Sequence, residues 1–393
     1  MGEKILVVDD SIDNRRLIAA VLGKKGYEVL EAASGHEAID RAPLLSPDLI
    51  LLDIMMPGPD GYEVCKRLKT EPGTRDIPII FLSAKTDAVD KVKGLEMGAA
   101  DYITKPFDKA EVIARVQSQL KIRALTQDLR LANQRLAEKQ KKIEEDLLAA
   151  SGIQQSLLPR NLPEAPELEF AWEFLPSHFI GGDIFNIFWL DRDTIGVYML
   201  DVSGHGVPSA LVTVSISQAL QPQAGLVRKK DAGGESFVVS PPGEVIRALD
   251  SEYPTERFDK FFTIIYMVLG LKERRLSYCS AGHPFPVLMR ANGGTELLEK
   301  GGSVIGLGGL VPFEEETIFL EKGDKLILYT DGMTDCRNSS GEFFGMEGLL
   351  GHLSKKRDMP IAGLLRCVLG ELLEFGGSSC AEDDISLLGM EFR

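Results

Sequence analysis

The chain has 393 residues, of which 44% are hydrophobic and 26% are charged, and its formal net charge is −15 at pH 7. This length exceeds one ordinary domain and fits two or three domains of a soluble globular protein. The acidic balance argues against nucleic acid as a partner, because proteins that bind a phosphate backbone need a basic surface. The five cysteines form no CxxC pair, so we expect free thiols in a reducing compartment.

The sequence predicts neither a signal peptide nor a membrane span. The N-terminal stretch MGEKILVVDD reaches two carboxylates after a short apolar run. The longest apolar run, residues 261–271, is too short to cross a bilayer and is expected to be a buried strand. We therefore expect a cytoplasmic protein with no membrane partner.

Residues 1–120 alternate short apolar runs with amphipathic stretches. Five of the runs are predicted strands, at residues 4–8, 27–30, 48–52, 77–81 and 100–104. Helix-like segments such as 13–25 and 88–98 lie between them. Strands that alternate with helices predict an α/β domain with a doubly wound, parallel, five-stranded sheet.

Residues 118–158 form one long polar segment with a heptad pattern. Apolar side chains recur every seven residues at Ile122, Leu129, Leu136, Ile143, Ala150 and Leu157. Leu125, Ala132 and Ile153 fill a second seam, which Lys139 and Asp146 interrupt. This spacing favours a coiled-coil linker over residues 121–158, and hence a homodimer, with a weak middle. The alternative is a single solvated helix that packs on its own chain.

Residues 159–393 are rich in β-type runs, with helical stretches at 209–220 and 346–356. The predicted strands are residues 194–203, 261–271, 275–282, 285–290, 316–320, 324–332 and 385–392. This mixture predicts a layered α+β domain. Residues 221–243 are expected to be an exposed loop.

The first group of candidate functional residues follows the strands of residues 1–120. Asp9 and Asp10 follow strand one, Asp53 strand three, Ser83 strand four and Lys105 strand five. The carboxyl ends of parallel strands meet at one edge of a sheet. Three acids packed together there would repel one another without a cation, and an oxygen-only set suits Mg²⁺. Asp53 is then a candidate nucleophile for phosphoryl transfer, whereas any one Asp alone would be read as a turn or a helix cap.

These residues lie in VVDD, LLDIMMPGPDG, FLSA and DYITKPF, and residues 1–120 resemble the receiver domain of two-component response regulators. The resemblance implies that Asp53 accepts a phosphoryl group from a sensor histidine kinase or a phosphotransfer protein. It also implies that Asp9 and Asp10 bind Mg²⁺ together with Asp53. Ser83, Tyr102 and Lys105 would read out the phosphate, and Lys105–Pro106 would be a cis peptide.

The second group of candidate residues consists of acids beside glycines or at strand ends in residues 159–393. Its members are Asp183, Asp201, Asp331, Asp383 and Asp384. Glycine lets the backbone approach a ligand or an ion closely. Acids in four such settings could form a binuclear centre that holds a phosphate and generates a hydroxide nucleophile. The alternative is that they serve only Asp-Gly turns.

The motifs GGD, DVSGHGVPSAL, AGHPFPVL, GDKLILYTDGMTD and DDISLL make this part of the chain similar to the sporulation and stress-response branch of the PPM/PP2C phosphatases. The resemblance implies an α-β-β-α sandwich that removes phosphate from phosphoserine or phosphothreonine in a protein. The usual substrate of that branch is a phosphorylated STAS-type anti-sigma-factor antagonist. It implies two Mn²⁺ or Mg²⁺ ions held by Asp183, Asp201, Asp331, Asp383 and the Val202 carbonyl, with Asp384 behind them.

Three further residues of these motifs raise questions of role. His205 is a candidate general acid, although the sequence favours an ordinary loop histidine there. His283 in AGHP is interpreted as structural. Asn186 stands three residues after Asp183, where the branch often has Asp, and its amide oxygen could still orient a metal-bound water.

The order of the parts predicts a switch with the receiver as input, the helix as transmitter and the phosphatase as output. Phosphorylation of Asp53 would alter helix pairing over residues 122–157 and, through IQQSLLP, the seating of the GGD segment. One rival is a non-enzymatic adaptor that binds a phosphoprotein without hydrolysing it. Another is a pure dimerisation module in which the Asp residues serve only turns.

Overall fold

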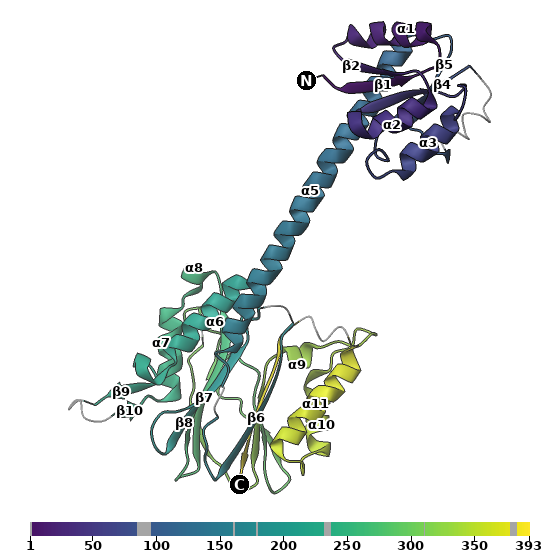
Figure 1. Ribbon diagram of the computed structural model, residues 1–393. Coiled ribbons are helices and arrows are strands. Elements are labelled where there is room, and N and C mark those ends of the chain that lie inside the picture. The colour runs from purple at the N-terminus through teal and green to yellow at the C-terminus, as the bar shows by residue number, and fades with distance from the viewer. Residues whose placement is uncertain are drawn as a thin grey trace. The chain divides into compact units, whose positions relative to one another are not determined.

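The computed structural model divides the chain into two compact units, residues 1–141 and 142–393. The residues that it describes are 2–84, 96–159, 162–177, 180–231, 237–309, 311–377 and 383–393. The helix α5 (Lys109–Gln155) contributes residues to both units (Figure 1). Within the described parts, no helix is both long and apolar enough to cross a membrane.

The first unit is built on one parallel sheet with the strand order β2-β1-β3-β4-β5. Its strands are β1 (Lys4–Val8), β2 (Glu28–Ala32), β3 (Leu49–Asp53), β4 (Ile79–Ser83) and β5 (Asp101–Thr104). One face packs against α2 (Gly35–Leu45) and α3 (Gly61–Thr70), and the other against α1 (Ile12–Gly23) and the start of α5. The predicted doubly wound fold is confirmed, and the helix expected over 88–98 lies largely outside the described residues.

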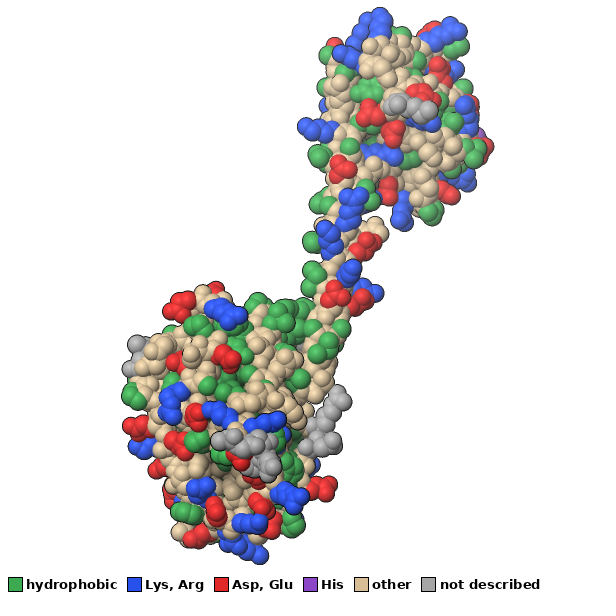
Figure 2. Space-filling view, turned by 90° about the vertical axis from the view of Figure 1, so that its left-hand side faces the viewer, with side chains coloured by type: hydrophobic (Ala, Val, Ile, Leu, Met, Phe, Trp, Pro, Cys, Tyr) green, Lys and Arg blue, Asp and Glu red, His purple; other side chains and the backbone are tan. Residues whose placement is uncertain are grey.

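Helix α5 begins earlier than the predicted linker, because the last helix of the first unit continues into it without a break. Val112, Val116 and Leu120 near its start are buried in the first unit. Further along, most apolar side chains of the heptad pattern are exposed, for example Leu129 at 62% and Leu136 at 64%, whereas Ala150 and Leu157 are half-buried. Figure 2 shows hydrophobic side chains among charged ones on this stretch. The second chain of the predicted coiled coil stays a prediction.

The second unit contains two sheets that pack face to face. One has the order β15-β12-β11-β8-β7, with β16 beside β12, and the other β14-β13-β17-β18-β6. The first sheet comprises β7 (Ile184–Trp189), β8 (Thr194–Val202), β11 (Phe262–Gly270), β12 (Arg275–Ala281), β15 (Gly301–Gly302) and β16 (Glu316–Phe319). The second comprises β6 (Leu168–Leu175), β13 (Val287–Met289), β14 (Thr295–Leu297), β17 (Lys325–Tyr329) and β18 (Ile385–Phe392).

Helices cover the outer face of each sheet (Figure 1). On the first sheet lie α6 (Val207–Ala219) and α7 (Pro242–Glu252), and on the second lie α10 (Gly345–Lys355) and α11 (Ile361–Gly376). Two short helices are α8 (Thr255–Phe258) and α9 (Gly332–Asp335). Between the sheets Trp172 meets Phe185 edge to face, with ring centroids 5.6 Å apart. The predicted α-β-β-α sandwich is therefore confirmed.

Two expectations are corrected. The segment 221–243 is not all loop, because it holds a short 3₁₀ helix (Pro222–Ala224) and the antiparallel pair β9 (Arg228–Lys230) and β10 (Phe237–Val239). Cys65, Cys279 and Cys367 carry free thiols, but Cys336 is disulfide-bonded. The expectation of free thiols throughout is therefore wrong for Cys336, because pairing depends on proximity in the fold, which spacing along the chain does not reveal.

Candidate functional sites

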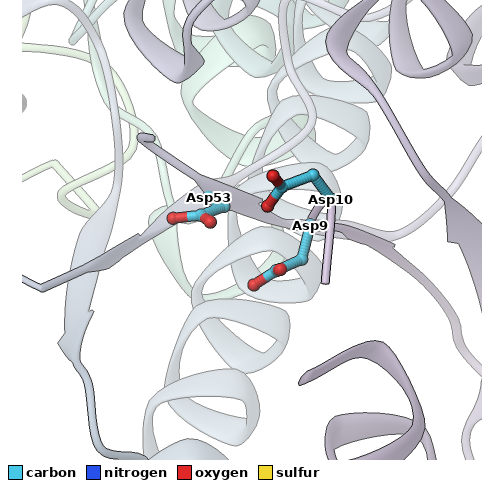
Figure 3. A group of neighbouring side chains, drawn as sticks. All are labelled: Asp9, Asp10 and Asp53. Carbon is cyan, nitrogen blue, oxygen red and sulfur yellow. The ribbon is translucent and has the colours of Figure 1, made fainter. Parts of the chain in front are cut away.

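The first site lies at the carboxyl edge of the parallel sheet in the first unit. Asp9 directly follows β1, Asp53 ends β3, and Lys105 directly follows β5. Ligand oxygens of Asp9, Asp10 and Asp53 all lie within 4.8 Å of one another (Figure 3). The Lys105 ammonium donates hydrogen bonds of 2.8 Å to both Asp9 and Asp53. The Lys105–Pro106 peptide is cis.

Neighbouring groups hold the Asp9 carboxylate in place. The backbone N–H of Ser11 and the side-chain amide of Asn14 both donate to it, at 2.9 and 3.0–3.1 Å. Arg15 donates to the carbonyl oxygen of Asp9 at 2.7 Å. This carboxylate is therefore fixed before any ligand binds.

The electrostatics of the first site leave negative charge to be balanced. Burial raises the pKa of the Asp53 carboxyl; Lys105 opposes the rise, and Asp9 adds to it. Burial lowers the pKa of Lys105, but its bonds to Asp53 and Asp9 outweigh burial and raise it, so the ammonium stays charged. Three carboxylates and one ammonium carry a formal charge of −3 + 1 = −2. An oxygen-only donor set with this charge fits one divalent hard cation.

The expected readout residues sit near this edge. Ser83 is buried at the end of β4, and its carbonyl oxygen accepts from the backbone N–H of Lys105 at 2.8 Å. Tyr102 is in β5, and the guanidinium of Arg115 from α5 lies over its ring at 5.3 Å. Arg115 also bonds Asp101 at 2.7 Å. Tyr102 is thus linked directly to the helix that continues towards the second unit.

The second site lies where both sheets of the second unit end at the same side. β7 runs antiparallel to β8, so Asp183, just before β7, lies beside Asp201 at the end of β8. β17 runs antiparallel to β18, so Asp331, just after β17, lies near Asp383 and Asp384, just before β18. Face-to-face packing then gathers all five acids from four strands.

The two glycines of GGD allow this close approach. A Cβ on Gly181 would lie 1.5 Å from a carboxylate oxygen of Asp384. A Cβ on Gly182 would lie 2.4 Å from the Val202 carbonyl oxygen and 3.0 Å from Asp201 Oδ1. A larger residue at position 181 would displace Asp384 of the second sheet, and one at position 182 would collide with the end of β8.

Hydroxyl groups from the second sheet hold Asp183. Thr330 and Ser386 each donate a hydrogen bond of 2.7 Å to its Oδ2. The Asp384 carboxylate instead accepts from the backbone N–H and hydroxyl of Ser177, at 2.9 and 3.0 Å. Asp384 is buried and Asp383 is exposed. This difference favours Asp383 as the acid that faces a ligand, with Asp384 fixing the loop around it.

Like charges dominate the second site. Burial raises the pKa of Asp183 well above its usual range, and Asp201 and Asp384 add to the rise. Burial, Asp331 and Asp383 raise the pKa of Asp201 to about 7. Burial and Asp383 likewise raise the pKa of Asp331. No lysine or arginine among the described residues contributes to these shifts, and carboxylate oxygens are the donors that hard cations prefer.

The histidines and Asn186 are placed as follows. His205 is exposed in the bend between β8 and α6. His283 is buried, and its Nδ1 lies 2.9 Å from the hydroxyl of Thr263, which pairs with Asp201 in the sheet. Burial lowers the pKa of His283 to about 3, so it stays neutral. This setting agrees with a structural role.

Asn186 does not reach the acids, contrary to the hypothesis that it orients a metal-bound water. It pairs with Tyr198 across β7 and β8, and its side chain hydrogen-bonds the Tyr198 hydroxyl. That hydroxyl lies 3.0 Å from Ser217 of α6. Side chains alternate between the faces of a strand, so Asn186 lies on the helix-covered face and Asp201 on the opposite one.

Gln154 is a site residue that the sequence did not single out. Its side-chain amide donates to the carbonyl oxygen of Gly181 at 2.8 Å and accepts from the N–H of Gly181 at 3.2 Å. It is buried near the end of α5, where it lines a small cavity together with Leu158, Phe174 and Asp183. The one sequence feature that could have pointed to Gln154 is its place in the motif IQQSLLP, directly after Ile153 of the second heptad seam.

Comparison with known proteins agrees with this geometry. The family model for stage II sporulation protein E (SpoIIE) matches residues 191–393, just over half of the chain. The chain belongs to the SpoIIE family. The match includes Asp201, Asp331 and Asp383, and Asp183 lies before it. A model of the response regulator receiver domain matches residues 5–117.

Individual relatives of this SpoIIE-family chain fall into the same two parts. The response regulator PleD of Caulobacter vibrioides is 45% identical over 130 residues, which are 33% of this chain and 29% of PleD. The phosphate regulon regulator PhoB of Pseudomonas aeruginosa is 48% identical over 125 residues, 31% of this chain and 53% of PhoB. The match thus spans about half or less of these curated relatives.

A solved structure supports the fold of the second part. The SiaA-PP2C domain of Pseudomonas aeruginosa aligns with a TM-score of 0.53 at 24% identity and covers 65% of this chain and 100% of that domain. The chain therefore joins a receiver domain to a SpoIIE domain of PP2C-like fold.

Proposed function

We propose that this chain is a response regulator whose output is the metal-dependent dephosphorylation of phosphoserine or phosphothreonine in a protein. The observation that carries the proposal is the second site, where acids from both sheets meet without a lysine or arginine among their described contacts. Asp183 and Asp384 are buried there, and Thr330 and Ser386 hold Asp183. Bound cations would offset the repulsion among these carboxylates and keep them ionised.

In the proposed mechanism Asp183, Asp201, Asp331, Asp383 and the Val202 carbonyl hold two Mn²⁺ or Mg²⁺ ions. When bound, such a pair lowers the pKa of water and stabilises charge on the phosphate. The residues of the chain orient the ligand oxygens: Thr330 and Ser386 point Asp183, and Ser177 fixes Asp384. His205 stays a candidate general acid, since its exposed place in the bend after β8 leaves it accessible to substrate.

In the receiver, Asp53 would be the phosphoacceptor. Mg²⁺ bound by Asp9, Asp10 and Asp53 would offset the charge of the incoming phosphoryl group, and Lys105 would pair with it. Ser83 and Tyr102 would then respond to the phosphoryl group. Tyr102 offers a path to α5, because Arg115 of that helix covers its ring.

Gln154 would couple α5 to the second site. It holds both backbone polar groups of Gly181, two residues before Asp183. A rotation or shift of α5 would therefore move the GGD segment. Pairing of two chains through the exposed seam of α5, weakened at Lys139 and Asp146, would supply two states of similar free energy.

A sensor histidine kinase or phosphotransfer protein would supply the phosphoryl group, and a phosphorylated STAS-type anti-sigma-factor antagonist would be the substrate. The rival function is a phosphoprotein-binding adaptor without hydrolysis. Release of phosphate from a phosphoserine protein with Mn²⁺, by wild type and Asp331→Ala, distinguishes them. We expect release by wild type alone. Binding of the phosphoprotein without release by wild type would support the adaptor.

A further inference from the structure

We propose that Lys260 binds the phosphate group of the substrate at the mouth of the second site. This inference rests on the phosphatase function proposed above and adds a substrate-binding residue to it. Lys260 lies just before β11, outside every motif that the sequence singled out.

The sheet register places Lys260 at the same end of the sheet as Asp201, three residues further along. Asp201 pairs with Thr263 and Val202 with Phe262. Ser203 continues this register, exchanging hydrogen bonds with Phe261: its N–H donates to the carbonyl at 2.9 Å, and its hydroxyl accepts from the N–H at 3.2 Å. Lys260 therefore stands opposite Gly204, three residues beyond the pair that contains Asp201. At about 3.3 Å per residue this is roughly 10 Å along the strand, within reach of a lysine side chain and a phosphate together.

The ammonium is held over the loop that follows Asp201. Its Nζ donates to the Ser203 carbonyl oxygen at 2.9 Å, and a Cβ on Gly204 would lie only 2.9 Å from it. The side chain is half-buried. Among the described residues no carboxylate pairs with Lys260, so its charge is not cancelled by a neighbouring acid.

The positive charge of Lys260 favours binding of an anion near the second site. The chain carries a net charge of −15, and the second site is lined by acids. A phosphate monoester dianion approaching them is repelled until it meets bound cations. A fixed ammonium at the entrance offsets that repulsion and donates a charge-assisted hydrogen bond to a phosphate oxygen. The ligand class is a phosphate monoester, with inorganic phosphate as its simplest form.

The test measures phosphate binding separately from turnover. Inorganic phosphate is titrated calorimetrically into the full chain with Mn²⁺, and kcat and KM are measured on a phosphoserine peptide. The variants are Lys260→Met, which removes the charge, and Lys260→Arg, which keeps it. Lys272→Met is the matched control, since Lys272 lies beyond the opposite end of β11 and pairs with Asp193 on the surface.

We expect Lys260→Met to weaken phosphate binding and raise KM by about tenfold, the effect of one charged hydrogen bond. Lys260→Arg should recover most of both, Lys272→Met should match wild type, and Mn²⁺ affinity should not change. Unaltered phosphate binding in Lys260→Met would overturn the proposal. So would equal losses in both Lys260 variants with a lowered melting temperature, because this would mean that the Ser203 bond is only structural.

The same measurements separate this proposal from the phosphatase function. If wild type binds phosphate through Lys260 but releases none from the peptide, the phosphatase function fails and the phosphate site stands. If wild type hydrolyses the peptide and Lys260→Met does so with the same KM, the site fails and the function stands.

Discussion

The two acid sites of this chain both cluster carboxylates that repel one another, but they differ in the positive charge that lies beside them. In the first unit, Lys105 bonds two of three clustered acids and leaves a formal charge of −2. In the second unit, Asp183, Asp201 and Asp331 receive no ion pair from a described lysine or arginine, and burial and mutual repulsion raise the pKa of each. A lysine therefore partly neutralises the first site, whereas no lysine or arginine of the described residues does so in the second.

This difference fits the two proposed tasks. A receiver accepts and loses one phosphoryl group on Asp53. An ammonium beside Asp53 can pair with the free carboxylate and with the phosphorylated side chain. A hydrolase centre must bring a dianion and water together, and two cations supply that without occupying the site with protein cations. Lys260 at the entrance would complete the second arrangement.

The largest effect is expected for Asp201→Asn. Loss of a ligand should lower phosphatase activity by at least roughly 100-fold. Without metal, the same change removes a repelling charge near pH 8, above the pKa of about 7, and should raise the melting temperature by a few degrees. Thermal unfolding with and without Mn²⁺ checks both parts. Asp193→Asn, at an acid outside both sites that is paired with Lys272, is the control. If Mn²⁺ raises the melting temperature of Asp201→Asn as much as that of wild type, the contrast between the two sites is wrong.

A smaller effect is expected for Gln154→Leu. The change removes two hydrogen bonds that position Gly181, each worth about 1 kcal/mol, so activity should change by up to roughly 30-fold. The response to a phosphodonor should shrink as well. Gln155→Leu, at the exposed neighbour, should behave as wild type. Equal rates and equal phosphodonor responses in the two variants would contradict the coupling role.

The next effect concerns pairing of α5. Lys139→Leu with Asp146→Leu completes the second apolar seam and should tighten dimerisation by about tenfold or more. Analytical ultracentrifugation of the full chain measures the dissociation constant, with Lys141→Leu and Glu144→Leu as a control outside both seams. If wild type and the seam variant are both monomers, α5 is a single solvated helix.

The smallest effect on activity is expected for Asn186→Asp. The residue faces Tyr198 and α6 rather than the acids, so restoring Asp should leave kcat within about twofold. Placing a carboxylate beside the buried Tyr198 should lower the free energy of unfolding by about 1–3 kcal/mol. Steady-state kinetics and chemical denaturation test this. A large gain in kcat would mean that position 186 acts on the metals after all.

The two sites also differ in how far the sequence predicts them. In a parallel sheet every strand ends at the same edge, so Asp9, Asp53, Ser83 and Lys105 could be grouped once the strands were recognised. In the second unit the acids meet through antiparallel pairs and the packing of two sheets. Neither β6 nor β7 was predicted, because Asn186 and the charged residues of β6 break the apolar runs.

The residues that support the second site could not be predicted from the sequence, because their roles arise only from the packing of the fold. Thr330 and Ser386 are ordinary hydroxyl residues until the sheets pack and point them at Asp183. Gln154 belongs to a polar helix whose surface residues look alike, and only its burial sets it apart. Lys260 has no motif, and its place comes from the register between β8 and β11.

The most direct test of the account is the rate of Mn²⁺-dependent dephosphorylation of a phosphoserine protein by the full chain, with and without a small phosphodonor. Wild type and Asp53→Asn are compared in the same assay, alongside their oligomeric state. We predict hydrolysis by both proteins and a change of rate with the donor in wild type only. Hydrolysis that ignores the donor, with an unchanged oligomeric state, would contradict control by the receiver. Absence of hydrolysis in every condition would contradict the phosphatase itself.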